Sequence, residues 1–450
     1  MASNSLLTSS LEYGIVARSI PLTGKILSGY LDASGSAAGL GIGNPNAEFT
    51  PNISTCAMAS DGGTAKLVWG SRTGDVLFMS VPKAMEIGNK RSPAEVKRCS
   101  VADEHEGAVI DSAWLAVQHG WVITGGADAR VKVWDAKNAS CVWVSEQILD
   151  SLIPDSCVKV AGSVQCGFVV GVFKSGHIRI WAGFDFTQPT FLADNIKEII
   201  VDSPIRTSMK GYDSSLTHEL KTLDLESSNN QLSLLVGYEN DCYFYRIQVD
   251  LSTSSIQTLA FGESFSGFIS SISPVFCSDK TESSVIFTGD YMGCISLYEW
   301  DEDFRNVNPR TNAISPFKKI EAHTDGASIT SIAWNGLVLV SGSVRGDARV
   351  FDGMTFKLLK TFESPHPRFR RRVSVADVGE TEREREEREK VRTILLGPDR
   401  DLVFMSIGNK VVAWKAGPVP KYIRSGVRGR NASTRNAGKR TAQSVKHFGE

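Results

Sequence analysis

The segment GGADARVKVWD, residues 125–135, places Asp128 six residues before Trp134. Thr124 stands four residues before the aspartate, and His105 lies upstream in DEHEGAVIDSAW. Histidine, a hydroxyl residue and aspartate are the residue types used in acid–base and nucleophilic catalysis. The same types also bind ligands or hold neighbouring strands together, so Asp128 is open to a catalytic, a ligand-binding or an architectural interpretation.

The other reactive residues lack the spacing that catalysis or metal binding requires. The seven histidines are dispersed without an HExxH motif, and no GxSxG motif is present. The eight cysteines contain no CxxC pair, which argues against a zinc site. Gly39, Gly41 and Gly43 do not form a GxGxxG phosphate loop. The sequence therefore predicts a protein that is not an enzyme and uses no metal or cofactor.

Composition predicts a folded protein rather than a globally electrostatic binder of nucleic acid or membranes. Hydrophobic residues make up 42% of the 450 residues, and 49 Lys and Arg nearly balance 50 Asp and Glu. The start MASNSLLTSSLEYG has neither a basic nor a sustained apolar region, and no stretch of about 18 apolar residues follows. Together with cysteines that lack a disulfide framework, this favours a cytoplasmic or nuclear protein.

The segment around Asp128 occurs twice in the chain. Residues 124–135, TGGADARVKVWD, align with residues 341–352, SGSVRGDARVFD, with Thr or Ser first and an aromatic residue ten positions later. Each copy has a histidine upstream, His105 in the first and His323 in the second. This similarity indicates an internal repeat.

Five fainter copies share a short apolar strand, a glycine, a polar turn and a second strand. The alternation of apolar and polar residues around each turn predicts antiparallel strand pairs, seven in all. Successive repeats lie 46 to 66 residues apart, which predicts long loops because a common propeller repeat has about 40–45 residues. The five copies are LVWGSRTGDVLFM (67–79), VVGVFKSGHIRIW (169–181), LLVGYENDCYFYR (234–246), VIFTGDYMGCISLY (285–298) and FMSIGNKVVAW (404–414).

With these repeats the chain resembles the WD-repeat family over roughly residues 51–416. The resemblance implies an all-β fold, a seven-bladed β-propeller with long inter-blade loops. It also implies a hydrogen-bonded network that ties the strands of one blade together, which favours the architectural role for Asp128. The matching network residues here are His105, Thr124, Asp128 and Trp134.

The sixth repeat departs from this pattern. His323 and Ser341 take the places of the network histidine and hydroxyl, but Arg345 stands where the aspartate would be and Phe351 where the tryptophan would be. We therefore expect that the network cannot form in this blade. We also expect the Arg345 side chain to be free for the surface.

The repeats divide the chain into three parts. Residues 1–50 form an N-terminal segment, residues 51–416 the propeller, and residues 417–450 a basic tail that we expect to be disordered. Because the sequence after the last hairpin offers no fourth strand, we expect residues 12–20, EYGIVARSI, to complete the last blade. The Gly-rich stretch 31–49 is expected to be a flexible loop.

Two charged segments leave alternatives open. Residues 365–392 carry a run of arginines and then a Glu/Arg mixture, which favours a solvated helix or a disordered loop, with partner docking as the alternative. The tail 417–450 has eight basic residues and one acid. It is either a solubilising tail or a segment for nuclear import or weak nucleic-acid contact, and it lacks the interleaved aromatics of single-strand binders.

The turns between the middle strands of the blades are the remaining candidate for a functional surface. By alignment, four basic residues and two tyrosines fall at or near these turns and would suit an acidic or phosphorylated peptide. The alternative is that turn residues are polar only because they face water. The candidate peptide-binding residues are Arg72, Lys174, Tyr238, Tyr291, Arg345 and Lys410.

A more specific resemblance concerns the whole chain. The propeller, the Arg/Glu insertion, the ending IGNKVVAWKAG (407–417) and the basic tail look like those of fungal F-box/WD-repeat proteins. This implies a substrate receptor of a Skp–cullin–F-box ubiquitin ligase, with protein or peptide partners and ligase subunits but no membrane partner. Residues 1–50 lack the helical periodicity of an F-box, so its adaptor-binding residues are not carried over. A general assembly scaffold in RNA processing or trafficking is the alternative.

Overall fold

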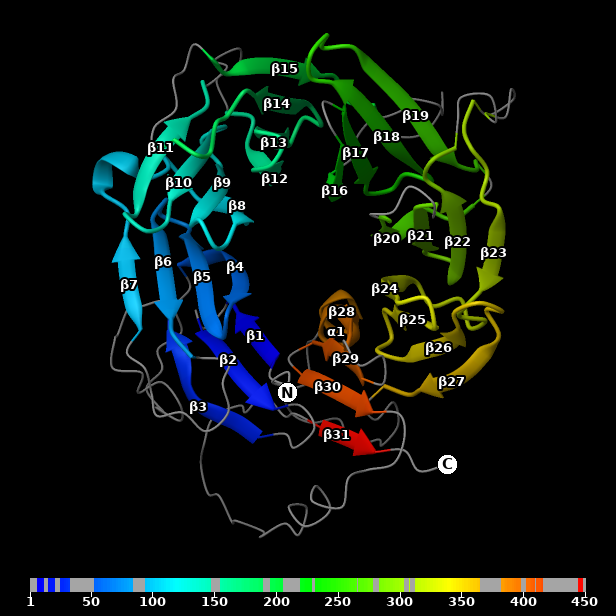
Figure 1. Cartoon of the computed structure of the whole chain (residues 1–450). Coiled ribbons are helices and arrows are strands. Elements are labelled where there is room, and N and C mark those ends of the chain that lie inside the picture. Colours follow the sequence, from blue (N-terminus) through cyan, green and yellow to red (C-terminus); the bar gives the residue numbers. More distant parts are fainter. Residues whose placement is uncertain are drawn as a thin grey trace. The chain divides into compact units, whose positions relative to one another are not determined.

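The secondary structure of the computed structural model consists almost entirely of β-strands (Figure 1). By contact the chain divides into two compact units, one of Met1–Ile20, Lys25–Val236 and Arg246–Thr258, the other of Pro21–Gly24, Gly237–Tyr245 and Leu259–Glu450. The residues that the structure describes are 6–11, 15–20, 25–32, 52–83, 94–146, 154–188, 195–204, 219–228, 231–264, 266–277, 283–302, 307, 312–364, 382–397, 402–408, 410–415 and 444–447.

Seven four-stranded sheets follow one another along the chain, and in each the strands pair in sequence order. This repeated meander is the blade of a β-propeller, so the predicted seven-bladed fold is confirmed. The first four sheets comprise β4 (Ile53–Asp61), β5 (Thr64–Ser71), β6 (Val76–Val81), β7 (Glu95–Arg98); β8 (Val109–Ala116), β9 (Trp121–Gly126), β10 (Val131–Asp135), β11 (Ser140–Val144); β12 (Cys157–Ser163), β13 (Phe168–Phe173), β14 (Ile178–Ala182), β15 (Lys197–Val201); and β16 (Leu220–Ser228), β17 (Gln231–Tyr238), β18 (Tyr243–Asp250), β19 (Ile256–Gly262). The other three comprise β20 (Ile269–Val275), β21 (Val285–Asp290), β22 (Cys294–Glu299), β23 (Lys318–Glu321); β24 (Ile329–Trp334), β25 (Val338–Ser343), β26 (Ala348–Asp352), β27 (Leu358–Phe362); and β28 (Val391–Leu396), β29 (Leu402–Ile407), β30 (Lys410–Lys415), β31 (Ser444–His447).

The N-terminal residues form a separate three-stranded sheet. Its central strand β2 (Ile15–Ile20) runs antiparallel to β1 (Leu6–Ser10) and to β3 (Lys25–Asp32). The prediction that residues 12–20 complete the last blade is therefore wrong. It overlooked that LLTSS before β2 and KILSGYLD after it are short strand-forming segments, so β2 has partners of its own on both sides.

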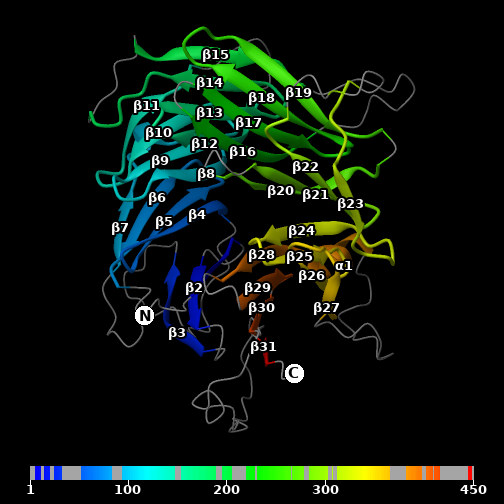
Figure 2. The same ribbon diagram turned by 45° about the vertical axis from the view of Figure 1, so that its right-hand side comes forward.

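This three-stranded sheet packs against the sheet of β4–β7, and the two lie side by side in both ribbon views (Figure 2). Val16 of β2 is fully buried in one cluster with Leu67 and Trp69 of β5. The guanidinium of Arg18 adds a hydrogen bond to the carbonyl of Lys83 at 3.3 Å. The N-terminal segment therefore contributes to the core of the first unit.

The last sheet takes its fourth strand from the basic tail. β31 runs parallel to β30, with Val412 opposite Ser444 and Lys415 opposite His447. For these four residues the expectation of a disordered tail is wrong, and the sequence did not reveal it because SVKH is short and lies far from β30 along the chain. Residues 417–443 and 448–450 of the tail lie outside the described residues, as do residues 33–50 with most of the Gly-rich stretch.

The charged insertion contains one short helix, α1 (Glu382–Glu389), directly before β28. Lys390 and Arg392 at its end both contact Glu387, at 2.5 Å and 3.7 Å. Residues 382–389 thus form a helix, one of the two forms, helix or disordered loop, that the sequence favoured. Residues 365–381, with the run of arginines, lie outside the described residues.

Neighbouring blades approach closely at a glycine in the second strand. A Cβ atom on Gly342 of β25 would lie 2.5 Å from Val391 Cγ1, at the start of β28. A Cβ atom on Gly70 of β5 would lie 2.7 Å from Val109 Cβ, at the start of β8. The glycines of the repeat are therefore required by packing between blades, since any side chain would overlap the next inner strand.

A hydroxyl group reinforces the same contact. Thr330 Oγ1, on β24, lies 2.6 Å from the carbonyl of Val391 and 3.3 Å from that of Gly342. In the first unit Ser54 makes the equivalent contacts, 2.5 Å to the first residue of β8 and 3.1 Å to the glycine of β5. One hydroxyl thus links the first two strands of a blade to the first strand of the next.

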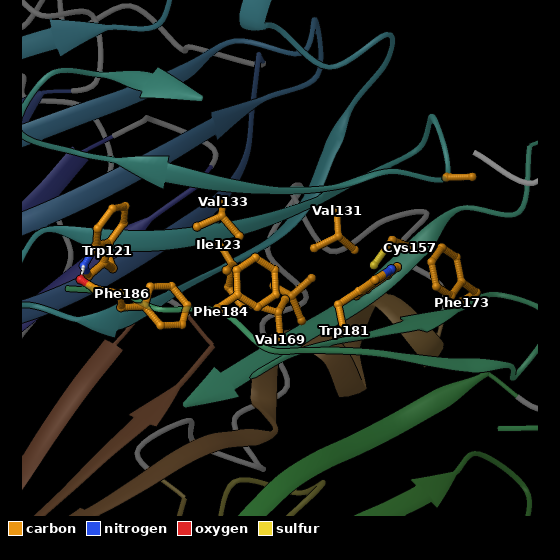
Figure 3. Packing of buried hydrophobic residues seen from close by; sticks show 12 residues of the cluster. Trp121, Ile123, Val131, Val133, Cys157, Val169, Phe173, Trp181, Phe184 and Phe186 are labelled. Carbon is orange, nitrogen blue, oxygen red and sulfur yellow. Dashed lines mark hydrogen bonds between the residues drawn. The ribbon is translucent and has the colours of Figure 1, made fainter. Parts of the chain in front are cut away.

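Aromatic and aliphatic side chains fill the space between the sheets of β8–β11 and β12–β15 (Figure 3). The Trp121 indole N–H donates to the carbonyl of Phe186 at 3.1 Å, and the two rings meet edge to face. Val131 and Trp181 are buried in the same cluster, one from each sheet. Such sheet-on-sheet packing fixes the positions of the turns that join the strands.

Candidate functional site

The four network residues of the second blade are in contact. His105 Nδ1 lies 3.0 Å from both carboxylate oxygens of Asp128, and His105 Nε2 lies 2.7 Å from Thr124 Oγ1. Trp134 Nε1 donates to the same hydroxyl at 2.8 Å. Because the ionised Asp128 carboxylate can only accept, His105 Nδ1 carries the proton between them, and the Thr124 hydroxyl, which accepts from the Trp134 indole, can donate to Nε2. Every member of this buried network is satisfied.

The carboxylate of Asp128 is stabilised in its ionised form. Burial taken alone would raise its pKa, but the hydrogen bond and charge of His105 lower the pKa below its usual value. The backbone N–H groups of Glu106 and Arg130 also donate to this carboxylate, at 3.0 Å and 3.2 Å. Asp128 therefore accepts hydrogen bonds at neutral pH and joins the loop before β8 to the β9–β10 turn.

The sixth blade has a similar network, contrary to the expectation from its sequence. His323 Nε2 lies 3.0 Å from Ser341 Oγ, and His323 Nδ1 lies 3.3 Å from Asp347 Oδ2. Asp347 stands six residues after the hydroxyl residue rather than four, so the turn supplies its carboxylate from a different position. The prediction that the network cannot form because Arg345 replaces the aspartate is therefore wrong.

Asp347 also holds its own turn. The Ser343 hydroxyl donates to the Asp347 carboxylate at 2.5 Å. Burial opposes ionisation, yet the nearby His323 imidazole and the hydrogen bond from Ser343 bring the pKa of Asp347 far below its usual value. Phe351, at the tryptophan position, is buried in the core and supplies no N–H to Ser341.

Arg345 is bound rather than free. Its Nη1 lies 2.6 Å from the Asp325 carboxylate and 3.3 Å from the carbonyl of the same residue. The side chain ties the β25–β26 turn to the loop before β24, and its exposed position still reaches solvent. The expectation of an unengaged basic group at this turn is corrected accordingly.

Hydroxyl, imidazole and carboxylate occur here in the order of a catalytic triad. Their burial excludes that role, because Thr124, Ser341 and His323 are each 0% exposed. A nucleophilic hydroxyl must reach the reacting atom of a substrate, and the buried hydroxyls of Thr124 and Ser341 cannot do so. In both blades the contacts join the loop before the first strand to the turn after the second strand.

One backbone hydrogen bond identifies equivalent turn positions in six blades. The residue directly after the second strand donates its N–H to the carbonyl of the residue directly before the first strand, at 2.6 to 3.3 Å. By this criterion Arg72, Lys174 and Tyr291 occupy equivalent positions. Arg345 comes one residue after the equivalent position in its blade, and Lys410 comes two residues after it. The six donors are Arg72, Ala127, Lys174, Tyr291, Val344 and Gly408.

The structure places the six candidate binding residues in different environments. Arg72 and Lys174 are exposed in turns of the first unit, and Tyr291 is exposed in a turn of the second. Lys410 is half-buried at the start of β30. Two of the six do not match the prediction: Tyr238 is buried, and Arg345 is bound to Asp325.

Tyr238 belongs to the core. It is 1% exposed, and its ring meets that of Tyr245 edge to face. The Tyr245 hydroxyl donates to Asp241 at 2.9 Å, which holds the turn between the two strands. The prediction that Tyr238 lies on a binding surface is wrong because it is the last residue of β17 and faces inward.

Three exposed apolar residues lie at one end of the β20–β23 sheet, in one of these turns and the loop beside it. Phe268, Tyr291 and Met292 are 42%, 45% and 64% exposed. The Tyr291 N–H donates to the Phe268 carbonyl at 3.0 Å. The Asp290 carboxylate accepts the N–H groups of Met292 and Cys294 at 2.9 Å and 2.8 Å, which holds the turn. We call Phe268, Tyr291 and Met292 the turn cluster.

Glycine and glutamate shape the surroundings of the turn cluster. A Cβ atom on Gly267 would lie 2.8 Å from Met292 Cγ, so the glycine lets Met292 lie over the loop. Partial burial raises the pKa of Tyr291, and the charge of Glu239 raises it further. An acidic side chain therefore borders the apolar surface.

Sequence reasoning missed Phe268 and Met292. Met292 aligns with Asp128 of the second blade, where the repeat has a polar residue. The sequence did contain a signal for Met292, because an apolar residue stands there at the turn position that holds the network aspartate in the second blade. Phe268 could be found only from the structure, because it lies in a loop outside the repeat motif.

Small-molecule and metal sites have little support in the part of the chain that the structure describes. There, no three His, Cys, Asp or Glu side chains are grouped to hold a metal. A cavity of about 160 Å³ is lined by Phe78, Met79 and Trp114 together with three lysines, and it is smaller than the roughly 300–1,000 Å³ of typical ligand pockets. Nor do the described helices include one long and apolar enough to cross a membrane.

Comparisons with known proteins support the fold alone. No protein-family model matches the chain, and no curated protein matches it. The computationally designed protein Ika8 is similar with a TM-score of 0.52 and 15% identity, covering 90% of this chain and 91% of that chain. Sqt1 of Saccharomyces cerevisiae is similar with a TM-score of 0.53 and 11% identity, covering 81% and 82%. These likenesses agree with the seven-bladed β-propeller fold described above.

Proposed function

We propose that this chain is a non-catalytic protein-interaction scaffold that binds a partner through the turn cluster. The observation that carries the proposal is Met292, the most exposed member of the cluster, held on a turn whose backbone is fixed by Asp290. Methionine and aromatic residues are enriched at protein interfaces. Exposed apolar residues that gather at one place on a folded protein mark interaction sites more often than scattered ones do.

The fixed turn makes this cluster suited to binding. A partner that buries Phe268, Tyr291 and Met292 would not have to order the backbone first, because the Tyr291 and Met292 N–H groups are already engaged. Preorganisation of this kind lowers the entropic cost of association. The nearby charge of Glu239 favours a basic residue beside the apolar anchor of the partner.

An acidic or phosphorylated peptide remains a second candidate ligand. It is supported by Arg72 and Lys174, which are exposed at equivalent turn positions of the first unit. Substituting both with glutamate should weaken binding of a phosphopeptide partner at least tenfold, with no change in folding, because exposed turn side chains contribute little to stability. Unaltered binding would remove these residues from the proposal.

The finer hypothesis is that the scaffold presents substrates to a Skp–cullin–F-box ubiquitin ligase. Its support is the resemblance in sequence to fungal F-box/WD-repeat proteins, together with a fold of the kind that those receptors use. The alternative is a scaffold in another complex, such as one for RNA processing or trafficking. Both versions share the same binding surface and differ in the proteins that accompany the chain.

Affinity purification with mass spectrometry tests the function and separates the two versions. The tagged chain, a Tyr291→Ser/Met292→Ser variant and a Val101→Ser control are purified from cells in parallel. Val101 is a suitable control because it is 84% exposed in the other unit. We expect a set of partners that the control retains and the double variant loses.

The outcomes have distinct meanings. Recovery of the F-box adaptor and a cullin supports the ligase version, whereas a different stable complex without them contradicts it and leaves the scaffold in place. If the double variant retains every partner, the turn cluster is not the binding site. If the unsubstituted chain recovers no specific partner, the scaffold function itself is contradicted.

A further inference from the structure

The outer strand of the sixth sheet exposes an apolar surface that the proposed function does not use. β27 is the end strand of the order β24-β25-β26-β27 and pairs with β26. Its first four residues are all exposed, and Leu358 and Leu359 are 51% and 59% exposed. The strand carries a bulge here: Val350 pairs with Lys360 and Phe351 with Leu358, so Leu359 is an extra residue, and Leu358 and Lys360 lie on opposite faces of the edge.

Five of the other outer strands, β7, β11, β15, β19 and β23, are different. β7 and β23 have the charged sequences EVKR and KKIE. In β11, β15 and β19 a single large apolar residue is exposed in each strand, namely Val144, Ile200 and Ile256. Two adjacent exposed leucines therefore distinguish β27 among these outer strands.

The turn that leads into β27 extends the apolar surface. Met354 in this turn is 76% exposed. The Gly353 N–H donates to the carbonyl of Leu337 at 2.7 Å, which brings the exposed Leu337 side chain to the same end of the sheet. The apolar surface thus continues from the strand onto two neighbouring turns, and together they form the β27 edge (Leu337, Met354, Leu358 and Leu359).

Lysines border this edge. Lys357 and Lys360 are exposed on either side of the leucines, and Lys318 Nζ lies 4.4 Å from the centre of the Phe356 ring. The neighbouring Asp352 carboxylate is engaged by the N–H groups of its own turn, at 2.7 Å and 3.1 Å. Lys318, Lys357 and Lys360 outnumber the two carboxylates of Asp352 and Glu363 near this edge. The net charge beside the apolar residues is therefore positive, which favours an acidic occupant.

We propose that the β27 edge binds an extended segment of a partner protein in which apolar and acidic residues alternate. The segment adds to the sheet as a further strand, its backbone pairing with β27. Its apolar residues cover Leu358 and Leu359, and an acidic residue lies opposite Lys360. Cross-strand pairs of opposite charge stabilise such an addition, whereas like charges oppose it.

Lys360 also argues against a second copy of this chain as the occupant. It is the central residue of the five-residue strand LLKTF. An antiparallel pair of two β27 strands centred on this residue would place two lysines directly opposite each other. Lysine on an edge strand is a common means of preventing self-association, and here it leaves the edge selective for an acidic strand.

The test measures peptide binding to the full chain by fluorescence anisotropy. The probes are a labelled peptide Ser-Val-Glu-Val-Glu-Val-Ser and the same peptide with lysine in place of glutamate. We expect saturable binding of the glutamate peptide, at least tenfold tighter than binding of the lysine peptide. Lys360→Glu should reverse this preference, and the matched control Lys197→Glu on the outer strand β15 should leave it unchanged.

The reversal protects the test against loss of folding, since a misfolded variant cannot gain affinity for the lysine peptide. The proposal is overturned if neither peptide binds saturably, or if Lys360→Glu binds both peptides as the unsubstituted chain does. It is also overturned if sedimentation shows a dimer that Leu359→Ser abolishes, because a second copy would then occupy the edge. Partner capture by the turn cluster is measured separately, so either proposal can fail alone.

Discussion

His323 Nε2 lies 3.0 Å from Ser341 Oγ, and both side chains are fully buried. The contact joins the loop before the first strand of the sixth blade to its second strand. In the second blade His105 and Thr124 make the same contact at 2.7 Å. These two pairs have the residue types of a catalytic centre, but their burial makes them part of the framework that holds the exposed turns.

Acid should weaken this framework through Asp347. Its pKa is lowered in the folded state, so its contribution to stability is complete above the unfolded-state pKa of about 3.9 and is lost as the pH falls below that value. In thermal unfolding between pH 7 and pH 2.5, the melting temperature of the chain should fall steeply below about pH 4. Asp347→Asn should be less stable at pH 7 and should show a flatter acid dependence.

Asp352→Asn provides the comparison for this acid dependence. The pKa of Asp352 is also lowered, by hydrogen bonds within its turn, but the group is exposed to solvent. Its substitution should change the acid slope much less. An unchanged slope for Asp347→Asn would show that this carboxylate does not carry the acid sensitivity.

Gly342→Ala should destabilise the second unit. The added Cβ would lie 2.5 to 2.6 Å from Val391 atoms, and overpacking of this kind costs about 1–3 kcal/mol. Chemical denaturation of Gly342→Ala, Val391→Ala and the double variant measures the effect as a cycle. The double variant should be more stable than the sum of the two single losses predicts, because Val391→Ala removes the two Cγ atoms from the contact. Strict additivity would contradict the overlap with these methyl groups.

Thr330→Val should remove the hydroxyl link between blades without changing the shape of the side chain. Two carbonyls lose a donor at 2.6 Å and 3.3 Å, and the expected loss of unfolding free energy is about 1–2 kcal/mol. Ser54→Ala removes the equivalent link in the first unit and should have a similar effect. A neutral result for both would mean that water replaces the hydroxyl at these contacts.

Val16→Ala should destabilise the first unit, because Val16 is fully buried against Leu67 and Trp69. Removing buried methyl groups from such a site costs about 1–3 kcal/mol, including the cavity left behind. Val144→Ala on the outer strand β11 is the matched control, since Val144 is largely exposed. Equal stability of the two variants in urea would contradict the packing of the N-terminal sheet on β4–β7.

The sequence predicted the seven blades because each hairpin repeats a local pattern of alternating residues around a turn. It also predicted the network of the second blade, whose members occupy conventional positions. Asp347 was missed because the carboxylate comes from two residues further along the turn, which an alignment by position cannot detect. The pairing of β2 with β1 and β3 was missed because these short strands lie outside the repeat.

The candidate binding surface was harder to predict for physical reasons. Whether a turn residue is exposed depends on the direction of its side chain, and for Tyr238 that direction is inward. Whether a basic residue is available depends on its neighbours, and Asp325 engages Arg345 from another loop. Neither the burial nor the ion pair is encoded in the local pattern that identifies the turn.

Site-specific photocrosslinking from position 292 tests the central claim most directly. A photoreactive phenylalanine analogue replaces Met292 in the full chain, and a matched sample carries it at Val101, which is more exposed than Met292 and lies in the other unit. The account predicts that irradiation in cells yields a discrete crosslinked protein from position 292 that is absent from position 101. The same crosslinking pattern from both positions, or none from position 292, would contradict the turn cluster as a partner-binding site.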